Sequence, residues 1–244
     1  DFTQSVPEIE ECYKKYNGYN DLISYELGFH AEYTCSEGLL KDLSALANKL
    51  QAPVFCHNSE TQKEVAECVN RYGMTPTVYL DSIGMFNYGG GGYHCVHMTD
   101  SDINVFEKRG MSIVLNPASN LKLASGIAPV SLFMKKGINL ALGTDGPASN
   151  NALDMFREMF LTTALAKYRE NDASAVDANE VLKMATLGGA RAMGLRNCDT
   201  LSRGKKADLI VIDLSQPNMQ PINNITKNLV YSGSKINVIL TMIN

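Results

Sequence analysis

Short apolar runs alternate with amphipathic stretches along most of the 244-residue chain. Apolar runs of four to eight residues bounded by polar turns are typical of buried strands, whereas apolar positions three or four residues apart are typical of helices. The predicted strands cover residues 22–28, 52–56, 93–97, 111–115 and 138–143. The predicted helices cover 1–18, 36–50, 61–72, 76–83, 99–109, 129–136, 153–170, 178–186 and 190–193. This alternation predicts an α/β fold with a parallel sheet that carries helices on its faces.

The tail has a different pattern. Residues 208–213, 228–231 and 237–243 are expected to be short strands, with Pro217, Pro221 and Gly233 in the connections. We therefore expect an α/β domain over 1–200 and part of a small β module over 201–244. Residues 116–126 are expected to be a long loop, and loops of that length in compact domains are often functional.

Composition excludes several classes of protein. A hydrophobic fraction of 45% and a charged fraction of 20% are those of a soluble globular domain, and a net charge of −4 offers no basic surface for nucleic acid. No apolar run is long enough to span a membrane. Residues 1–4 lack the features of a signal peptide, so a cytoplasmic location is expected. The six cysteines form no C-x-x-C pair and are expected to be free thiols.

Four candidate chemical groups follow or end predicted strands. They are His30, His57, His94 and Asp145. In a (β/α) barrel the carboxyl ends of the strands meet at one mouth, where side chains distant in sequence come together. A single histidine at a strand end is more often a core residue, but four such groups together predict a site. Imidazole and carboxylate are ligands for Zn²⁺ or Fe²⁺.

Glu60 follows His57 by three residues in His57-Asn58-Ser59-Glu60. That spacing can direct both side chains into one pocket, where Glu60 would act as an acid or base beside an electrophile. Alternatively, Glu60 is simply a carboxylate near the start of the following helix, favoured by the helix dipole. His97 is expected to point to the opposite face of its strand from His94 and to be structural.

Several longer segments give a specific resemblance. They are Gly28-Phe29-His30-Ala31-Glu32-Tyr33-Thr34-Cys35-Ser36, Cys56 to Thr61, Tyr93-His94-Cys95-Val96-His97, Asn116 to Gly126, Leu142 to Asn151, and Gly204-Lys205-Lys206-Ala207-Asp208-Leu209-Ile210. Their order and spacing resemble the amidohydrolase superfamily, in particular the methylthioadenosine/S-adenosylhomocysteine deaminases and their chlorohydrolase relatives. The resemblance implies a TIM (β/α)8 barrel, of which about strands 4–8 are present, followed by the small β module.

The resemblance also implies roles for the candidate residues. His57 and Asp145 would bind one divalent metal, Zn²⁺ or alternatively Fe²⁺, and Asp145 would take a proton from the attacking water. His94 would orient that water, Glu60 would protonate the ring nitrogen and contact the substrate, and His30 would contact the heterocycle. The implied reaction is hydrolytic deamination of an adenine-type nucleoside such as methylthioadenosine, S-adenosylhomocysteine or adenosine. Guanine deamination, triazine dechlorination and a non-catalytic binding subunit are the alternatives.

Two departures from the family pattern stand out. The His-x-His motif of the first barrel strand does not occur, and Glu32 replaces a proline that relatives often have. Two protein ligands are fewer than a catalytic zinc site normally has, so we expect the chain alone to be inactive. We expect a fragment, or a chain that pairs with a complementing N-terminal chain, more than a metal-free relative. A homo-oligomer and a small nucleoside or heterocyclic ligand are the other expected partners.

Overall fold

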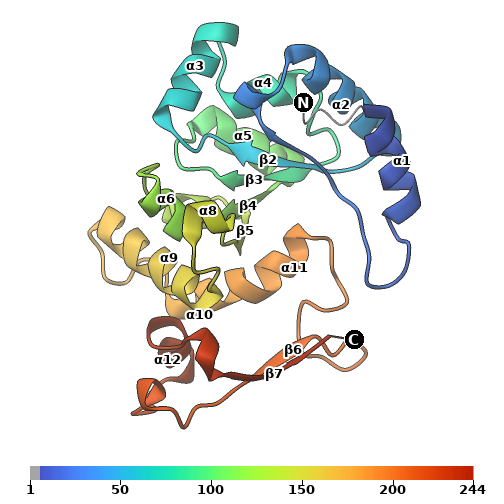
Figure 1. Cartoon of the computed structure of the whole chain (residues 1–244). Coiled ribbons are helices and arrows are strands. Elements are labelled where there is room, and N and C mark those ends of the chain that lie inside the picture. Colours follow the sequence, from blue (N-terminus) through green and yellow to red (C-terminus); the bar gives the residue numbers. More distant parts are fainter. Residues whose placement is uncertain (1–5, 244) are drawn as a thin grey trace. The chain divides into compact units, whose positions relative to one another are not determined.

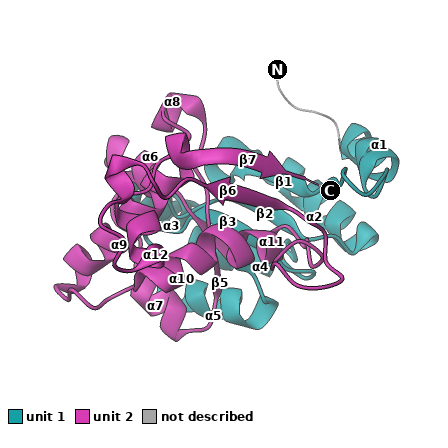
Figure 2. Ribbon diagram, turned by 90° about the horizontal axis from the view of Figure 1, so that it is seen from below, with its two compact units in different colours: residues 1–112 teal, residues 113–244 magenta. Residues whose placement is uncertain are grey.

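The computed structural model describes residues 6–243. Residues 1–5 and residue 244 lie outside the described part. The expectation that residues 1–4 do not begin a signal peptide concerns this undescribed segment. The chain forms two compact units, Asp1–Ser112 and Ile113–Asn244, coloured separately in Figure 2. Within residues 6–243, every helix is too short or too polar to cross a membrane. The expected division at residue 200 stays a prediction.

The first unit alternates strands with helices, as the sequence predicts (Figure 1). Its elements are α1 (Val6–Tyr16), β1 (Leu27–Ala31), η1 (Glu32–Thr34), α2 (Glu37–Leu50), β2 (Val54–Asn58), α3 (Gln62–Tyr72), α4 (Pro76–Ser82), β3 (Gly90–His94) and α5 (Asp100–Arg109). The core consists of apolar side chains from both kinds of element, among them Leu27, Leu40, Val54, Phe86 and Phe106, each at most 1% exposed.

Helix starts in this unit are specified by local capping chemistry. The hydroxyl of Ser36 accepts a hydrogen bond from the Leu39 N–H, and Thr61 and Thr99 each form a reciprocal capping box with the acidic residue three positions later. α3 and α5 end at Gly73 and Gly110, which adopt the left-handed conformation. The predicted N-caps Ser36 and Thr99 are therefore confirmed.

Two strand predictions are wrong in position. β1 begins five residues after the predicted start at Leu22, because Leu22 is 68% exposed and the first buried residue is Leu27. β3 contains the glycines that were expected to precede it and ends at His94. A Cβ at Gly90 would lie 1.9 Å from the carbonyl oxygen of Val54, so the approach of β2 requires glycine there.

The strands pair in parallel, as predicted. Leu27 of β1 aligns with Val54 of β2, and β2 pairs with β3 along its whole length, from Val54 opposite Gly90 to Asn58 opposite His94. The five-stranded sheet follows chain order, β1-β2-β3-β4-β5, with β4 at Ser112–Leu115 and β5 at Asn139–Leu142. This arrangement agrees with an α/β fold that represents strands 4–8 of a TIM barrel.

The second unit contains the remaining helices and a separate small sheet. After β5 its elements are α8 (Pro147–Asn150), α9 (Met155–Glu170), α10 (Ala178–Lys183), the π-helical segment η2 (Met184–Gly188), α11 (Gly189–Ala192), β6 (Leu209–Ile212), η3 (Pro217–Met219), α12 (Ile225–Tyr231), η4 (Lys235–Asn237) and β7 (Val238–Met242). Before β5 lie α6 (Pro117–Lys122) and α7 (Val130–Lys135). β6 and β7 pair in antiparallel fashion, which confirms a small β module.

Two expectations in this unit are wrong. Residues 116–126 contain helix α6, which begins with Pro117 at its first position, where proline is favoured. Residues 228–231 belong to helix α12 because the Asn224 side chain caps it by accepting from the Lys227 N–H, and its buried Val230 lies on the side that packs against α9 and α10. The six cysteines are free thiols, as expected, and Cys56, Cys68 and Cys95 are buried.

Candidate metal centre

His57 lies in β2 with its imidazole held in one tautomer. Its Nδ1 is 2.7 Å from the carbonyl oxygen of His30 in the neighbouring strand β1. A carbonyl only accepts hydrogen bonds, so Nδ1 carries the proton and donates it. Nε2 then keeps its lone pair, which is the state that a metal ligand requires. His30 thus contributes through its backbone, a role that the sequence did not predict. The His30 ring is exposed, and its centroid lies 4.7 Å from the centroid of the His57 ring.

His94 ends β3 and is fully buried. Its φ of 68° lies in the left-handed region, which costs a residue other than glycine of the order of 1–3 kcal/mol and is common at functional sites. Its ring stacks against that of His57 with centroids 5.4 Å apart, and its Nε2 lies 3.8 Å from Oε2 of Glu60. The structure therefore places His57, His94 and Glu60 together within the first unit.

The loop that carries Glu60 is held by a residue that the sequence analysis did not single out. Oε1 of Glu64 accepts from the Ser59 N–H at 2.8 Å, and Oε2 accepts from the N–H of Glu60 at 2.7 Å. Glu64 is buried, and that burial raises the pKa of its carboxyl although the accepted backbone hydrogen bonds oppose the shift. The capping-box pattern of Thr61 and Glu64 is the sequence signal that could have identified this residue.

His97 lies beyond the end of β3, so the expectation about its strand face is wrong. Its backbone N–H donates to the Ser59 carbonyl oxygen at 2.9 Å, which ties the two loops that follow β2 and β3. This contact is in keeping with the structural role expected for His97.

Asp145 follows β5 and also has a positive φ, of 59°. Both of its carboxylate oxygens accept hydrogen bonds. Oδ1 accepts from the Gly146 N–H at 2.7 Å, and Oδ2 accepts from the hydroxyl of Ser119 in α6 at 2.5 Å. Ser119 belongs to residues 116–126. The sequence predicts a functional role for this segment but does not indicate which residue has it.

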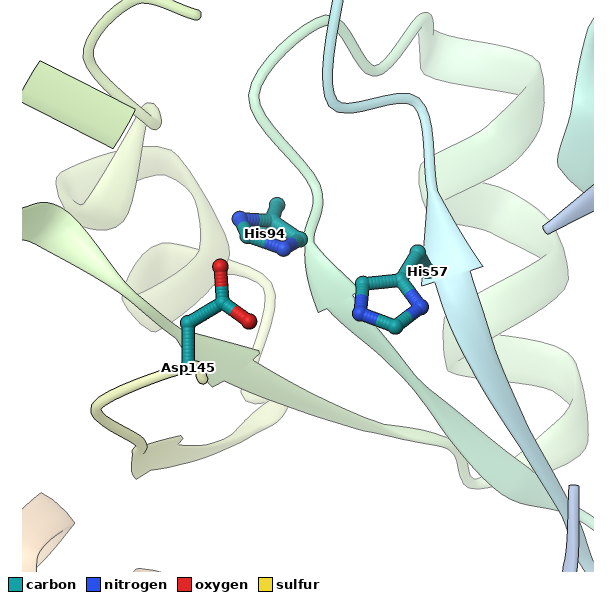
Figure 3. Close-up of side chains that lie close together, drawn as sticks. All are labelled: His57, His94 and Asp145. Carbon is teal, nitrogen blue, oxygen red and sulfur yellow. The ribbon is translucent and has the colours of Figure 1, made fainter. Parts of the chain in front are cut away.

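Figure 3 shows the side chains of His57, His94 and Asp145. One potential ligand atom from each lies within 4.8 Å of the other two, and among the described residues these three form a group that could hold a metal ion. Two imidazoles and one carboxylate are donors of the kinds that Zn²⁺ or Fe²⁺ takes. The residues present therefore fit a divalent metal.

Comparisons with known proteins agree with this chemistry. A model of the amidohydrolase family matches residues 4–244. The chain is 45% identical, over 97% of its length and 56% of the relative, to a 5-methylthioadenosine/S-adenosylhomocysteine deaminase of Caldanaerobacter subterraneus. It is 42% identical, over 94% of its length and 53% of the relative, to a 5'-deoxyadenosine deaminase of Methanothermobacter thermautotrophicus.

A solved structure is similar as well. A crystal structure of an adenosine deaminase from Xanthomonas campestris with bound zinc superposes with a TM-score of 0.92 at 39% identity, covering 97% of this chain and 54% of that one. The chain thus spans about half the length of the curated relatives it matches.

Proposed function

Because the chain belongs to the amidohydrolase family, we propose that its protein is a metal-dependent deaminase that hydrolyses an adenine-type nucleoside and releases ammonia. The observation that carries this proposal is the donor group of His57, His94 and Asp145, with the Glu60 carboxylate 3.8 Å from the His94 ring. A hydrolytic deaminase needs such a set, because water must lose both of its protons while the ring and the leaving amine each gain one.

His57 and Asp145 would hold the metal, which would lower the pKa of a water molecule and so make hydroxide available near neutral pH. Asp145 accepts the proton that this water loses. His94 orients the water and stabilises negative charge as the C–O bond forms. Glu60 donates a proton to the ring nitrogen beside the attacked carbon and regains one from the new hydroxyl on that carbon as the carbonyl forms. Asp145 passes the proton that it took from water to the leaving amine. The C–N bond then breaks, so that one water is consumed and one ammonia is released.

The substrate class follows from the relatives' names and the exposed residues of the first unit. Methylthioadenosine, S-adenosylhomocysteine and 5'-deoxyadenosine all carry adenine on a ribose without a free 5'-hydroxyl. The exposed His30 ring lies beside His57 and would contact the heterocycle. We therefore propose an adenine nucleoside modified at its 5' carbon as the substrate. Guanine and triazines are the competing substrates.

We further propose a cytoplasmic location and a small-molecule ligand as the main partner. A homo-oligomer and a complementing N-terminal chain are alternatives that size measurements of the purified protein would separate. Relatives of the chain act on small nucleosides, according to their names.

The test is metal content and ammonia release by the full-length gene product and by the 244-residue chain. We expect about one zinc ion per full-length molecule and deamination of methylthioadenosine or 5'-deoxyadenosine in preference to guanine. The chain alone is expected to do neither. A full-length product that holds no metal and releases no ammonia would support a binding protein instead, and preferential release from guanine or dechlorination of a triazine would support the alternative enzymes.

A further inference from the structure

Ser119 makes a short contact with Asp145, 26 residues away in the sequence. We propose that Ser119 is a positioning residue, whose hydroxyl fixes the orientation of the Asp145 carboxylate for metal binding and proton acceptance. This inference rests on the proposed function of Asp145 and goes beyond it, because Ser119 has no role in the proposed mechanism.

The geometry of the contact supports orientation. A carboxylate rotates about its Cβ–Cγ bond unless both oxygens are engaged, and this rotation exchanges the lone pairs that face a ligand. Gly146 holds Oδ1 from the adjoining backbone and Ser119 holds Oδ2 from another element, so the plane of the carboxylate is defined from two sides. Ser119 is fully buried, and water therefore does not compete for its hydroxyl.

Helix α6, which carries Ser119, is itself fixed to α9 by a buried carboxylate. Oε2 of Glu158 accepts from the N–H of Ala118 at 3.0 Å, one residue before Ser119. Oε1 of Glu158 accepts from the Asn150 side-chain amide at 2.7 Å, and the same amide donates to the carbonyl oxygen of Thr144. Thr144 is the residue before Asp145. Glu158 therefore anchors the backbone next to both partners of the Ser119–Asp145 hydrogen bond.

If Ser119 only stabilised its own helix, its hydroxyl would be expected to bond to backbone groups of that helix. Serine in the first turn of a helix commonly bonds to nearby backbone of the same segment. Here the hydroxyl instead reaches the carboxylate that follows β5, and α6 begins with Pro117 without a side-chain cap. Residues that donate a hydrogen bond to a metal ligand commonly fix the orientation of that ligand, and the buried Ser119 hydroxyl makes such a bond to Asp145.

The experiment compares Ser119→Ala, Ser119→Thr and Ser119→Val in the full-length gene product. Threonine and valine have the same shape, so their difference isolates the hydroxyl even if alanine impairs folding. Ser131→Ala is the matched control, because the Ser131 hydroxyl in α7 is buried and has no hydrogen-bond partner within residues 6–243. The readouts are zinc affinity by competition with a chelator, the visible absorption spectrum of the Co²⁺-substituted protein, and kcat/KM for ammonia release.

We expect Ser119→Ala and Ser119→Val to weaken zinc binding and lower kcat/KM by about 10- to 100-fold and to alter the Co²⁺ spectrum. Ser119→Thr should restore most of both, and Ser131→Ala should match the unaltered protein. Equal zinc affinity and equal Co²⁺ spectra in the threonine and valine variants would overturn the positioning role while leaving the proposed deaminase intact. An unaltered protein that binds no zinc would overturn both proposals.

Discussion

The loop after β2 and the loop after β5 both lie beside candidate metal donors, but different kinds of contact hold them in place. His57 lies near the end of β2, just before the first loop, and Asp145 lies in the second. Each loop is held by a buried glutamate from a helix that follows. Glu64 holds the first loop through backbone N–H groups four or five residues before it. Glu158 holds the second through the side chain of Asn150, which donates to Thr144, and it also accepts from the N–H of Ala118 in α6, 40 residues away.

The difference lies in the partners of the two glutamates. Both oxygens of Glu64 accept from backbone N–H groups, so that site suits only an acceptor. Oε1 of Glu158 instead faces the Asn150 amide, whose buried Oδ1 has no hydrogen-bond partner in the described part of the chain. The Asn150 amide belongs to a side chain and can turn over, whereas the backbone N–H groups that face Glu64 cannot. Burial raises the pKa of the Glu158 carboxyl, which favours the protonated form.

The largest effect should come from removing His57 beside the first loop or Asp145 in the second. We expect His57→Ala and Asp145→Ala each to abolish zinc binding and ammonia release by the full-length gene product, because each removes one of the two ligands that this part of the protein is proposed to supply. Zinc content by atomic absorption and an ammonia assay would measure this. His97→Gln is the histidine control and should retain both. Full zinc content in either alanine variant would show that the donor group is wrongly assigned.

Removing each glutamate should destabilise the protein. We expect Glu64→Ala and Glu158→Ala each to lower the free energy of unfolding by about 3 kcal/mol, because each leaves at least two donors without a partner in the interior, at roughly 1–3 kcal/mol per group. Urea unfolding of the full-length gene product would measure the loss. A change below about 0.5 kcal/mol, typical of surface positions, would contradict the anchoring role.

Glutamine at the same two positions should separate the two loops. Glu64→Gln puts an amide NH₂ against a backbone N–H, and we expect a loss of about 1–3 kcal/mol. In Glu158→Gln the side-chain carbonyl can still accept from Ala118, while the NH₂ faces the Nδ2 donor of Asn150. The Asn150 amide can turn over to accept from that NH₂ at the cost of its hydrogen bond to Thr144, so we expect a smaller loss, of about 1 kcal/mol. Equal losses in the two variants, again from urea unfolding, would remove the distinction drawn between the loops.

The smallest effect we expect is that the difference in stability between Glu158→Gln and the unaltered protein changes with pH. The raised pKa means that the folded protein binds the Glu158 proton more tightly than the unfolded chain does. Its stabilising contribution is present below the unfolded pKa and is lost as the pH rises through the folded pKa. Glutamine does not titrate, so the stability of Glu158→Gln relative to the unaltered protein should increase from about pH 4 upward. Thermal midpoints across pH would show it, and a decrease with pH would refute the protonation argument.

Local chemistry determined much of this protein. The order and alternation of strands and helices, the caps at Ser36 and Thr99, and the choice of His57, Glu60, His94 and Asp145 as candidates depend on patterns within a few residues. The Thr61–Glu64 capping box, and with it the support of the first loop, is also a short-range pattern that the sequence displays.

Tertiary structure decided what depends on distant partners. The tautomer of His57 follows from a carbonyl in β1, and the glycines of β3 belong to the strand because β2 approaches closely. Helix α12 replaces a predicted strand because its side chains pack on α9 and α10. The partners of Ser119 and Glu158 lie 26 and 40 residues away, and no periodicity encodes which side chains meet once the chain has folded.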